Sequence, residues 1–192
     1  PMLITKNNLQ YLESLIDLAP LHMPAHLASI KAFQKYIPEV PQVALFDTAF
    51  HATMPKENFL YAIPYAWYQK YGVRKYGFHG LSCQYITQVM EKQFHHPVNL
   101  IICHIGNGAS ITLVENSQSK DNSMGFTANA GLIMGSRCGD IDYSILPYLQ
   151  KTTGKTLEEL NIILNKQSGL DAFVHGQSVN RSLEKCDEQI ND

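Results

Sequence analysis

The stretch that most constrains the fold of this 192-residue chain covers residues 101–114. An apolar run ends at His104, the sequence Gly-Asn-Gly follows at residues 106–108, and a second apolar run then begins. This order predicts a strand, a tight turn and a second strand. Glycine permits positive φ and asparagine tolerates it, so the backbone N–H groups of such a turn can surround an anion such as phosphate. An ordinary β-hairpin explains the Asn-Gly pair equally well.

Composition points to a globular protein that handles a small molecule. The chain is 45% hydrophobic and 17% charged, which is ordinary for a folded protein. A formal net charge of −2, without a sustained Lys/Arg cluster, argues against partners such as nucleic acid or a membrane surface. No apolar run approaches the roughly 18 residues of a membrane span. The four cysteines have no CxxC spacing, so we expect free thiols in a reducing cytoplasm.

Apolar stripes predict two helices near the start of the chain. Residues 9–16 carry one stripe and residues 27–37 carry another, and a stiff, proline-containing loop is expected over residues 19–26. This loop holds His22 and His26. Pro24 disturbs the helical spacing that a pair of metal-binding histidines needs, so local hydrogen bonding is favoured over metal binding.

Residues 43–51 place a carboxylate where catalytic groups are often found. We expect a short, buried apolar strand that ends at Asp47. A strand fixes a carboxylate at its carboxyl end while leaving it at the rim of a crevice, which favours a catalytic role. The alternative is an aspartate that caps a turn.

His79 is expected at the junction between a loop and a helix. Gly77 and Gly80 flank it, and the following residues form a stripe of Leu81, Tyr85 and Val89. Free backbone N–H groups at a helix start, together with the imidazole, can bind an anion.

Arg137 lies between two glycines in the sequence Gly135-Ser-Arg-Cys-Gly139. A guanidinium on such a backbone can bind a phosphoryl group during its transfer. Pairing with Asp140 or Asp142 explains its position equally well.

Other signals place further elements. Gly72 should end a helix over residues 65–71, and a capping box from Thr156 to Glu159 should begin another. Residues 115–123 are expected to form a polar loop.

Four segments in register, residues 46–51, 76–80, 104–110 and 134–142, resemble the acetate kinase family, and the resemblance runs from residue 17 to about residue 181. It implies an α/β fold of the actin-like (ribonuclease H-like) class, present only in part. Residues 1–52 would be the carboxyl-side portion of the first lobe. Residues 53–192 would form a portion of the second lobe with the nucleotide phosphate loop.

The resemblance also implies an activity: transfer of a phosphoryl group between ATP and acetate, or another short-chain carboxylate, with Mg²⁺. In that family pattern Asp47, His79 and Arg137 correspond to catalytic residues. Family metal ligands lie outside this chain, and a cytoplasmic homodimer is expected. The remaining matched positions are nucleotide-binding (His104, Ile105, Gly106, Asn107, Gly108 and Arg181) and substrate-binding (Leu21, His22 and Phe78).

Several positions depart from the family pattern. Leu81 replaces Thr, Cys83 replaces His, residues 128–130 replace a Pro-Leu-acidic run, and Val179 replaces Asp. The chain also resembles only the middle of the longer family members, so we expect the isolated fragment to be weakly active or inactive. A second hypothesis is therefore a non-catalytic fragment or degenerate paralogue that retains the fold and self-association only.

Overall fold

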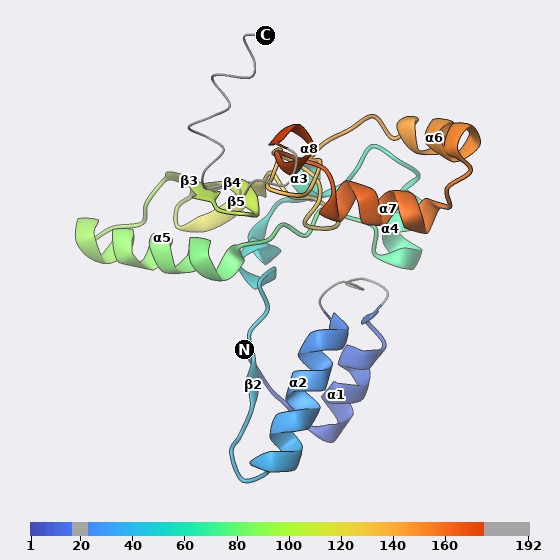
Figure 1. The fold of residues 1–192 in the computed structure, drawn as a ribbon. Coiled ribbons are helices and arrows are strands. Elements are labelled where there is room, and N and C mark those ends of the chain that lie inside the picture. The colour runs from blue at the N-terminus through green and yellow to red at the C-terminus, as the bar shows by residue number, and fades with distance from the viewer. Residues whose placement is uncertain (17–22, 175–192) are drawn as a thin grey trace.

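The computed structural model describes residues 1–16 and 23–174 (Figure 1). Its first part is a pair of antiparallel helices, α1 (Lys6–Glu13) and α2 (Met23–Tyr36), beside a two-stranded antiparallel sheet of β1 (Met2–Leu3) and β2 (Val43–Ala44). Both predicted helices are confirmed. The expected loop is wrong at its end, because α2 already begins at Met23 and accepts Pro24 in its first turn.

The strand expected before Asp47 is much shorter than predicted and is not buried. β2 has two residues and pairs with a strand of two residues, β1. Val43 is 57% exposed and Leu45 is 61% exposed. A ribbon this small cannot cover its own apolar side chains. Asp47 therefore follows an exposed ribbon and does not end a buried strand.

The centre of the molecule is an antiparallel sheet of β3 (Leu100–Ile105), β4 (Ala109–Glu115) and β5 (Gln118–Asn122), in that order. The predicted hairpin is confirmed, since Ile105 pairs with Ala109 across the turn. Helix α5 (Gly80–Phe94) packs on one face, where Cys83 contacts Ile102 and Val114 in a small core.

The polar loop expected over residues 115–123 is wrong, because β5 lies there. Asn116 and Ser117 form the preceding turn with φ of 48° and 61°, which is the backbone of a tight hairpin. Two polar residues of β5, Ser119 and Asn122, are buried and hydrogen-bonded. Hydropathy cannot distinguish such a strand from a loop.

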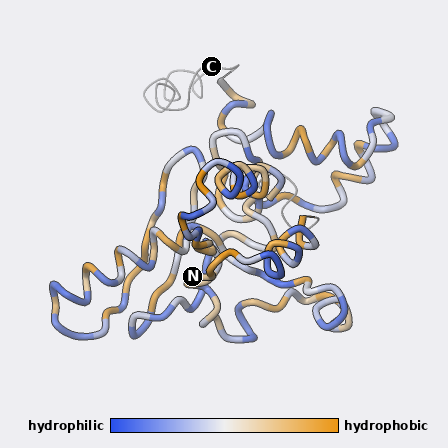
Figure 2. The backbone as a smooth tube through the Cα atoms, turned by 90° about the horizontal axis from the view of Figure 1, so that it is seen from below, coloured by the Kyte–Doolittle hydropathy of each residue, from blue (hydrophilic) through white to orange (hydrophobic). Residues whose placement is uncertain are grey.

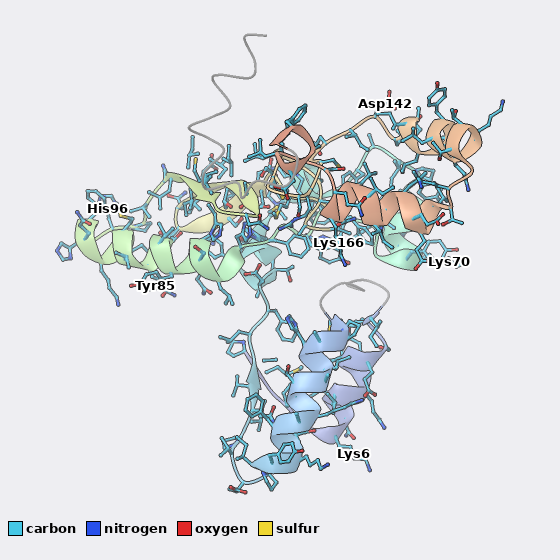
Figure 3. All side chains as sticks on the ribbon, in the orientation of Figure 1. Lys6, Lys70, Tyr85, His96, Asp142 and Lys166 are labelled. Atoms are coloured by element: carbon cyan, nitrogen blue, oxygen red, sulfur yellow. The ribbon has the colours of Figure 1, made fainter. Side chains whose placement is uncertain are left out.

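Helix α5 buries a different face from the predicted stripe. Leu81, Tyr85 and Val89 are 41%, 67% and 41% exposed, and Tyr85 extends away from the sheet (Figure 3). The buried residues are Gly80, Cys83 and Thr87. Small side chains at these positions let the helix lie close to the sheet.

The remaining elements are helices. The predicted helix ends are confirmed at Gly72, which has φ of 67°, and at the capping box of Thr156. The elements are the 3₁₀ helix η2 (Ala49–Thr53), α3 (Lys56–Phe59), α4 (Tyr65–Tyr71), α6 (Ile145–Thr153), α7 (Leu157–Lys166) and α8 (Asp171–Val174).

Along the chain, hydrophobic segments are short and interrupted by hydrophilic residues (Figure 2). Within the described residues, no helix is both long enough and apolar enough to cross a membrane. The proposed division at residue 52 stays a prediction. His51 and Thr53, on either side of it, both hydrogen-bond to Ser119 of β5.

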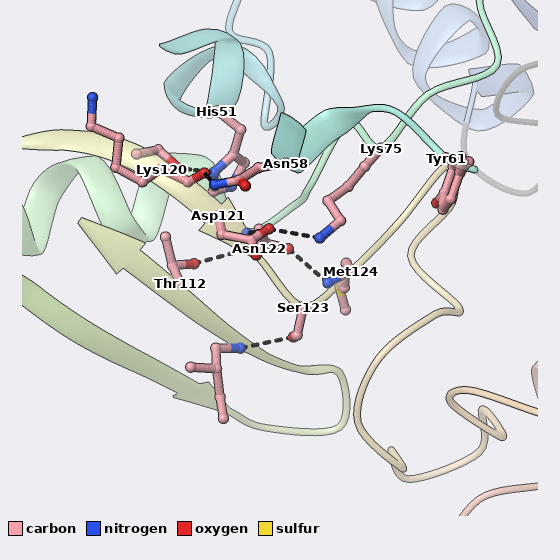
Figure 4. Close-up of polar contacts among 12 residues, drawn as sticks. His51, Asn58, Tyr61, Lys75, Thr112, Lys120, Asp121, Asn122, Ser123 and Met124 are labelled. Atoms are coloured by element: carbon pink, nitrogen blue, oxygen red, sulfur yellow. Dashed lines mark hydrogen bonds and ion pairs between the residues drawn. The ribbon is translucent and has the colours of Figure 1, made fainter. Parts of the chain in front are cut away.

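Asn122 joins the sheet to the segment before α5. Its Nδ2 donates to Thr112 Oγ1 at 2.7 Å and to the Phe78 carbonyl oxygen at 3.2 Å. Its Oδ1 accepts from the backbone N–H of Met124 at 2.9 Å and of Phe78 at 3.3 Å. Figure 4 shows the contacts with Thr112 and Met124. The buried amide of Asn122 thus uses both its donor and its acceptor capacity.

Replacing the Asn122 side chain should destabilise the folded chain. We expect Asn122→Ala to lower the free energy of unfolding by about 2–4 kcal/mol, because several buried groups lose their partner at once. Asn58→Ala is the matched control, since Asn58 donates a single hydrogen bond to Lys120, and it should cost about 1 kcal/mol or less. Urea unfolding of both variants measures the difference. Equal costs would contradict the structural role assigned to Asn122.

Candidate functional site

Three of the four segments singled out in the sequence meet around Gly108. A Cβ atom built on Gly108 would lie 2.6 Å from Arg137 Nη2 and 3.4 Å from His79 Nε2. Neither Gly106 nor Gly108 has positive φ. The turn therefore does not use the positive φ that its glycines permit. Gly108 is required instead because a side chain there would displace the guanidinium.

Asp47, from the fourth segment, holds the start of α5. His79 precedes the helix in the left-handed region, with φ of 58°. The Asp47 carboxylate accepts the backbone N–H of His79 at 2.7 Å and of Leu81 at 3.3 Å, and its carbonyl oxygen accepts the N–H of Gly80 at 2.9 Å. Asp47 thus binds the start of a distant helix, whereas the alternative interpretation expected it to cap a turn of its own segment. Two carboxylate oxygens retain further acceptor capacity, so the catalytic interpretation stays a prediction.

The peptide group of Phe78 is fixed on both sides. His51 Nε2 donates to the Phe78 carbonyl oxygen at 2.8 Å, and the Asn122 amide donates to the same oxygen. His51 is fully buried, and its Nδ1 lies 2.8 Å from Ser119 Oγ. Because a carbonyl only accepts, His51 must carry its proton on Nε2. Burial lowers the pKa of His51, which keeps the ring neutral. These contacts hold His79 in its unusual backbone conformation.

The rings of His79 and His104 stack, with centroids 3.9 Å apart and planes inclined by 16°. Each Nδ1 faces a serine hydroxyl: Ser110 Oγ is 2.9 Å from His79, and Ser82 Oγ is 3.1 Å from His104. Burial, the neighbouring His104 and the cation of Arg137 lower the pKa of His79, although Asp47 opposes them. The His79 ring is therefore neutral, and it lies beside the permanently charged guanidinium of Arg137.

Arg137 is half-buried, and among the described residues it pairs with no carboxylate. Its Nη1 donates to the Ala128 carbonyl oxygen at 2.6 Å. Asp140 instead accepts from the N–H of Gly131, and Asp142 from the N–H of Ser144. The alternative in which Arg137 pairs with these aspartates is therefore wrong. Burial lowers the pKa of Arg137, but the guanidinium stays charged.

Close backbone packing fixes the loop that carries Arg137. The N–H of Gly135 donates to the Asn107 carbonyl oxygen at 2.9 Å, so this loop and the hairpin turn are joined directly. Gly169 lies against the backbone of Met134 and Arg137, where an added Cβ would collide with both. The position of the guanidinium thus depends on segments from three parts of the chain.

Not every predicted site residue joins this group. Alternation along β3 places the exposed side chain of Ile105 on the opposite face of the sheet from His104. The ring of Phe78 packs against a core cluster of Ala109, Met124 and Met134. Leu21, His22 and Arg181 lie outside the described residues. The binding roles of all these residues stay predictions.

Sequence reasoning missed four residues that support the site: His51, Ser82, Ser110 and Asn122. Ser110 and Asn122 are buried polar residues on strands. For Ser110 a polar residue at an inward position of a strand was the available signal, because a buried polar group needs a partner. For Asn122 this signal was hidden, since its strand was expected to be a loop. For His51 and Ser82 the sequence carries no comparable signal, since their partners are far away along the chain.

A metal centre does not fit the described residues. They contain no group of three His, Cys, Asp or Glu side chains that could hold a metal ion.

Comparison with known proteins gives a consistent result. A model of the acetokinase family matches residues 1–192. An acetate kinase of Anoxybacillus flavithermus is 51% identical over 188 residues, which are 96% of this chain and 47% of the relative. An acetate kinase of Geobacillus kaustophilus is 48% identical over 194 residues, which are 100% of this chain and 49% of the relative.

Solved structures agree. A propionate kinase from Francisella tularensis superimposes with a TM-score of 0.86 at 46% identity, over 89% of this chain and 45% of that chain. An acetate kinase from Porphyromonas gingivalis gives 0.83 at 37% identity, over 97% of this chain and 49% of that chain. The predicted α/β fold of the actin-like class is confirmed, and the chain spans about half the length of the relatives it matches.

The buried histidines make stability depend on pH. The pKa values of His51 and His79 are lowered from an ordinary value near 6.5. Below that pH the unfolded chain binds more protons than the folded one, so stability should fall as the pH drops. Urea unfolding at pH 7.5 and pH 5.5 should show this loss. His51→Gln should reduce it, while His96→Gln, at an exposed position, should not. If the free energy of unfolding of His51→Gln fell between pH 7.5 and pH 5.5 as much as that of the wild-type chain, the assignment of this pH dependence to His51 would be contradicted.

Proposed function

The chain belongs to the acetokinase family, and on this premise we propose that it carries part of a site for reversible phosphoryl transfer between ATP and a short-chain carboxylate such as acetate. The observation that supports the proposal most strongly is the convergence of Arg137 and His79 at Gly108. A half-buried guanidinium without a carboxylate partner in the described part of the chain attracts an anion. The neutral imidazole of His79 lies close to the same glycine, so a second donor is at hand.

In this proposal Arg137 and His79 stabilise the transferring phosphoryl group. Charge in the transition state of phosphoryl transfer spreads over the equatorial oxygens, so donors and cations placed around it lower the barrier. Nη2 of Arg137 makes no hydrogen bond to the described residues, and it lies close to Gly108. Nε2 of His79 lies close to the same glycine. Both donors are fixed before any substrate binds.

Asp47 orients the other participants. An acid substrate is already ionised near pH 7, so no strong base is needed. We assign to Asp47 the positioning of His79 through the backbone of α5, together with orientation of the substrate through its remaining acceptor sites. Residues 104–108 would contact the nucleotide phosphates. Leu21, His22 and Phe78 would contact the acyl group, and Arg181 the nucleotide.

ATP/ADP and Mg²⁺ are the proposed cofactors. When bound to the nucleotide, Mg²⁺ neutralises phosphate charge. Since the described residues do not form a site for this ion, no step here is assigned to it. A cytoplasmic homodimer that binds small molecules, with no nucleic acid or membrane partner, completes the proposal.

A second candidate function is association without catalysis. One observation favours it: the outer face of the central sheet is apolar and exposed. Ile101 and Ile105 are 72% and 67% exposed, beside Ile111 and Leu113 on the neighbouring strand. An apolar face of this kind favours contact with another protein surface. In this case the folded chain would self-associate and would form no acyl phosphate.

Trapping of acyl phosphate separates the two candidates. The purified chain is incubated with ATP, Mg²⁺ and acetate, and hydroxylamine converts any acyl phosphate to a hydroxamate. We expect low product formation that falls by at least about 100-fold in Arg137→Ala, because a donor to the transition state is lost. Arg74→Ala is the control: it removes the same charge from a guanidinium that lies 3.6 Å above the Phe59 ring, and it should retain product formation.

Binding of ATP, measured by titration calorimetry, accompanies the assay. A folded chain that neither binds ATP nor forms product would overturn the proposed function. Self-association of that chain in light scattering would then support the second candidate.

Gly108→Ala tests the geometry around the guanidinium. The new methyl group would meet the end of a flexible side chain, so the fold should persist while Arg137 moves. We expect ATP affinity to fall about tenfold, measured by calorimetry, which corresponds to about 1.4 kcal/mol.

The effect should also depend on Arg137. In an Arg137→Ala background, Gly108→Ala should lower the ATP affinity little further, because the guanidinium that it displaces is already absent. Fully additive losses would show that Gly108 does not act through the guanidinium.

A further inference from the structure

The Ser110 hydroxyl lies within hydrogen-bond distance of the His79 ring. Ser110 is fully buried on β4, opposite His104 of β3, and its Oγ lies 2.9 Å from His79 Nδ1. Within residues 1–16 and 23–174, this Oγ makes no other hydrogen bond. The contact between Ser110 and His79 therefore has to satisfy the hydroxyl group.

The burial of Ser110 determines the direction of this hydrogen bond. A buried hydroxyl proton needs an acceptor. The available acceptor is a lone pair on His79 Nδ1, so the hydroxyl donates and Nδ1 accepts. A neutral imidazole carries one ring proton, and with Nδ1 occupied as an acceptor that proton lies on Nε2. The opposite arrangement would leave the hydroxyl proton of Ser110 buried without a partner.

A neighbouring histidine shows the same arrangement independently. His51 must donate from Nε2, because its partner there is the Phe78 carbonyl oxygen. Its Nδ1 consequently accepts from Ser119 Oγ, at 2.8 Å. Both histidines thus have a buried serine at Nδ1, and in His51 the carbonyl contact fixes the direction of donation without reference to Ser119.

His79 Nε2 lies close to Gly108, beside the guanidinium of Arg137. A Cβ at that glycine would lie 3.4 Å from Nε2 and 2.6 Å from Arg137 Nη2, so the two donors border one region. The stacked ring of His104 restricts rotation of the His79 ring. In the other tautomer Nε2 would present a lone pair, which repels a phosphoryl oxygen.

We propose that Ser110 is a positioning residue that fixes the Nε2–H tautomer of His79, so that the neutral ring donates a hydrogen bond to a phosphoryl oxygen. The tautomer follows from the contacts of the chain alone. The role toward a phosphoryl oxygen rests on the proposed function.

Nitrogen NMR tests the tautomer directly. In chain labelled with ¹⁵N on histidine, two-bond ¹H–¹⁵N correlations at pH 7.5 distinguish the two neutral tautomers, and His79→Gln identifies the His79 signals. We expect the Nε2–H pattern for His79 in the wild-type chain. Ser110→Ala should shift His79 toward the Nδ1–H form, and Ser110→Thr, which keeps the hydroxyl, should restore the original pattern. Ser82→Ala, which alters the partner of His104, should leave the His79 tautomer unchanged.

Inorganic phosphate serves as the probe for binding. Its affinity for the chain, measured by ³¹P line broadening, should fall at least threefold in Ser110→Ala and recover in Ser110→Thr. A wild-type His79 in the Nδ1–H form would overturn the proposal, even if Ser110→Ala did not fold. A His79 spectrum unaffected by Ser110→Ala would overturn it as well. A correct tautomer together with no phosphate binding by any variant would refute the proposed function and leave the assignment of Ser110 to the tautomer standing.

Discussion

The hydrogen bonds around the Phe78 peptide group are the constraint on which the site depends. His51 and Asn122 hold its carbonyl oxygen, and Asn122 also accepts its N–H. The next residue, His79, adopts a left-handed backbone that costs free energy for a non-glycine residue. Surrounding contacts must offset that cost. Since the backbone of His79 sets the direction of its ring, these two buried side chains determine where the imidazole points.

Much of the fold could be predicted from the sequence, because its signals were local. The hairpin over residues 100–115, the helix ended by Gly72 and the capping box of Thr156 all depend on neighbouring residues, and all are present. The strand β5 and the buried face of α5 could not be predicted in this way. β5 buries polar side chains, and α5 buries small ones, so hydropathy indicated the wrong assignment in each case.

The candidate site shows the same division between features with a local sequence signal and features that depend on distant partners. The motifs with Asp47, His79, Gly108 and Arg137 were visible in the sequence, and the structure brings them together. The partners of the supporting residues were not visible, because Ser110, Asn122 and His51 act on residues that are 31, 44 and 27 positions away. The competing interpretations of Arg137 could be separated only in three dimensions, where Asp140 and Asp142 bond to backbone N–H groups instead.

The place of Asp47 in the chain links the first two helices to the start of α5. It lies just after β2, in the segment that joins the helical pair α1 and α2 to the rest of the molecule (Figure 1). Its carboxylate and carbonyl oxygen together accept hydrogen bonds from three successive N–H groups at the start of α5. A displacement of the helical pair would therefore act on the same few atoms that orient His79, and Asp47 would pass it to the imidazole.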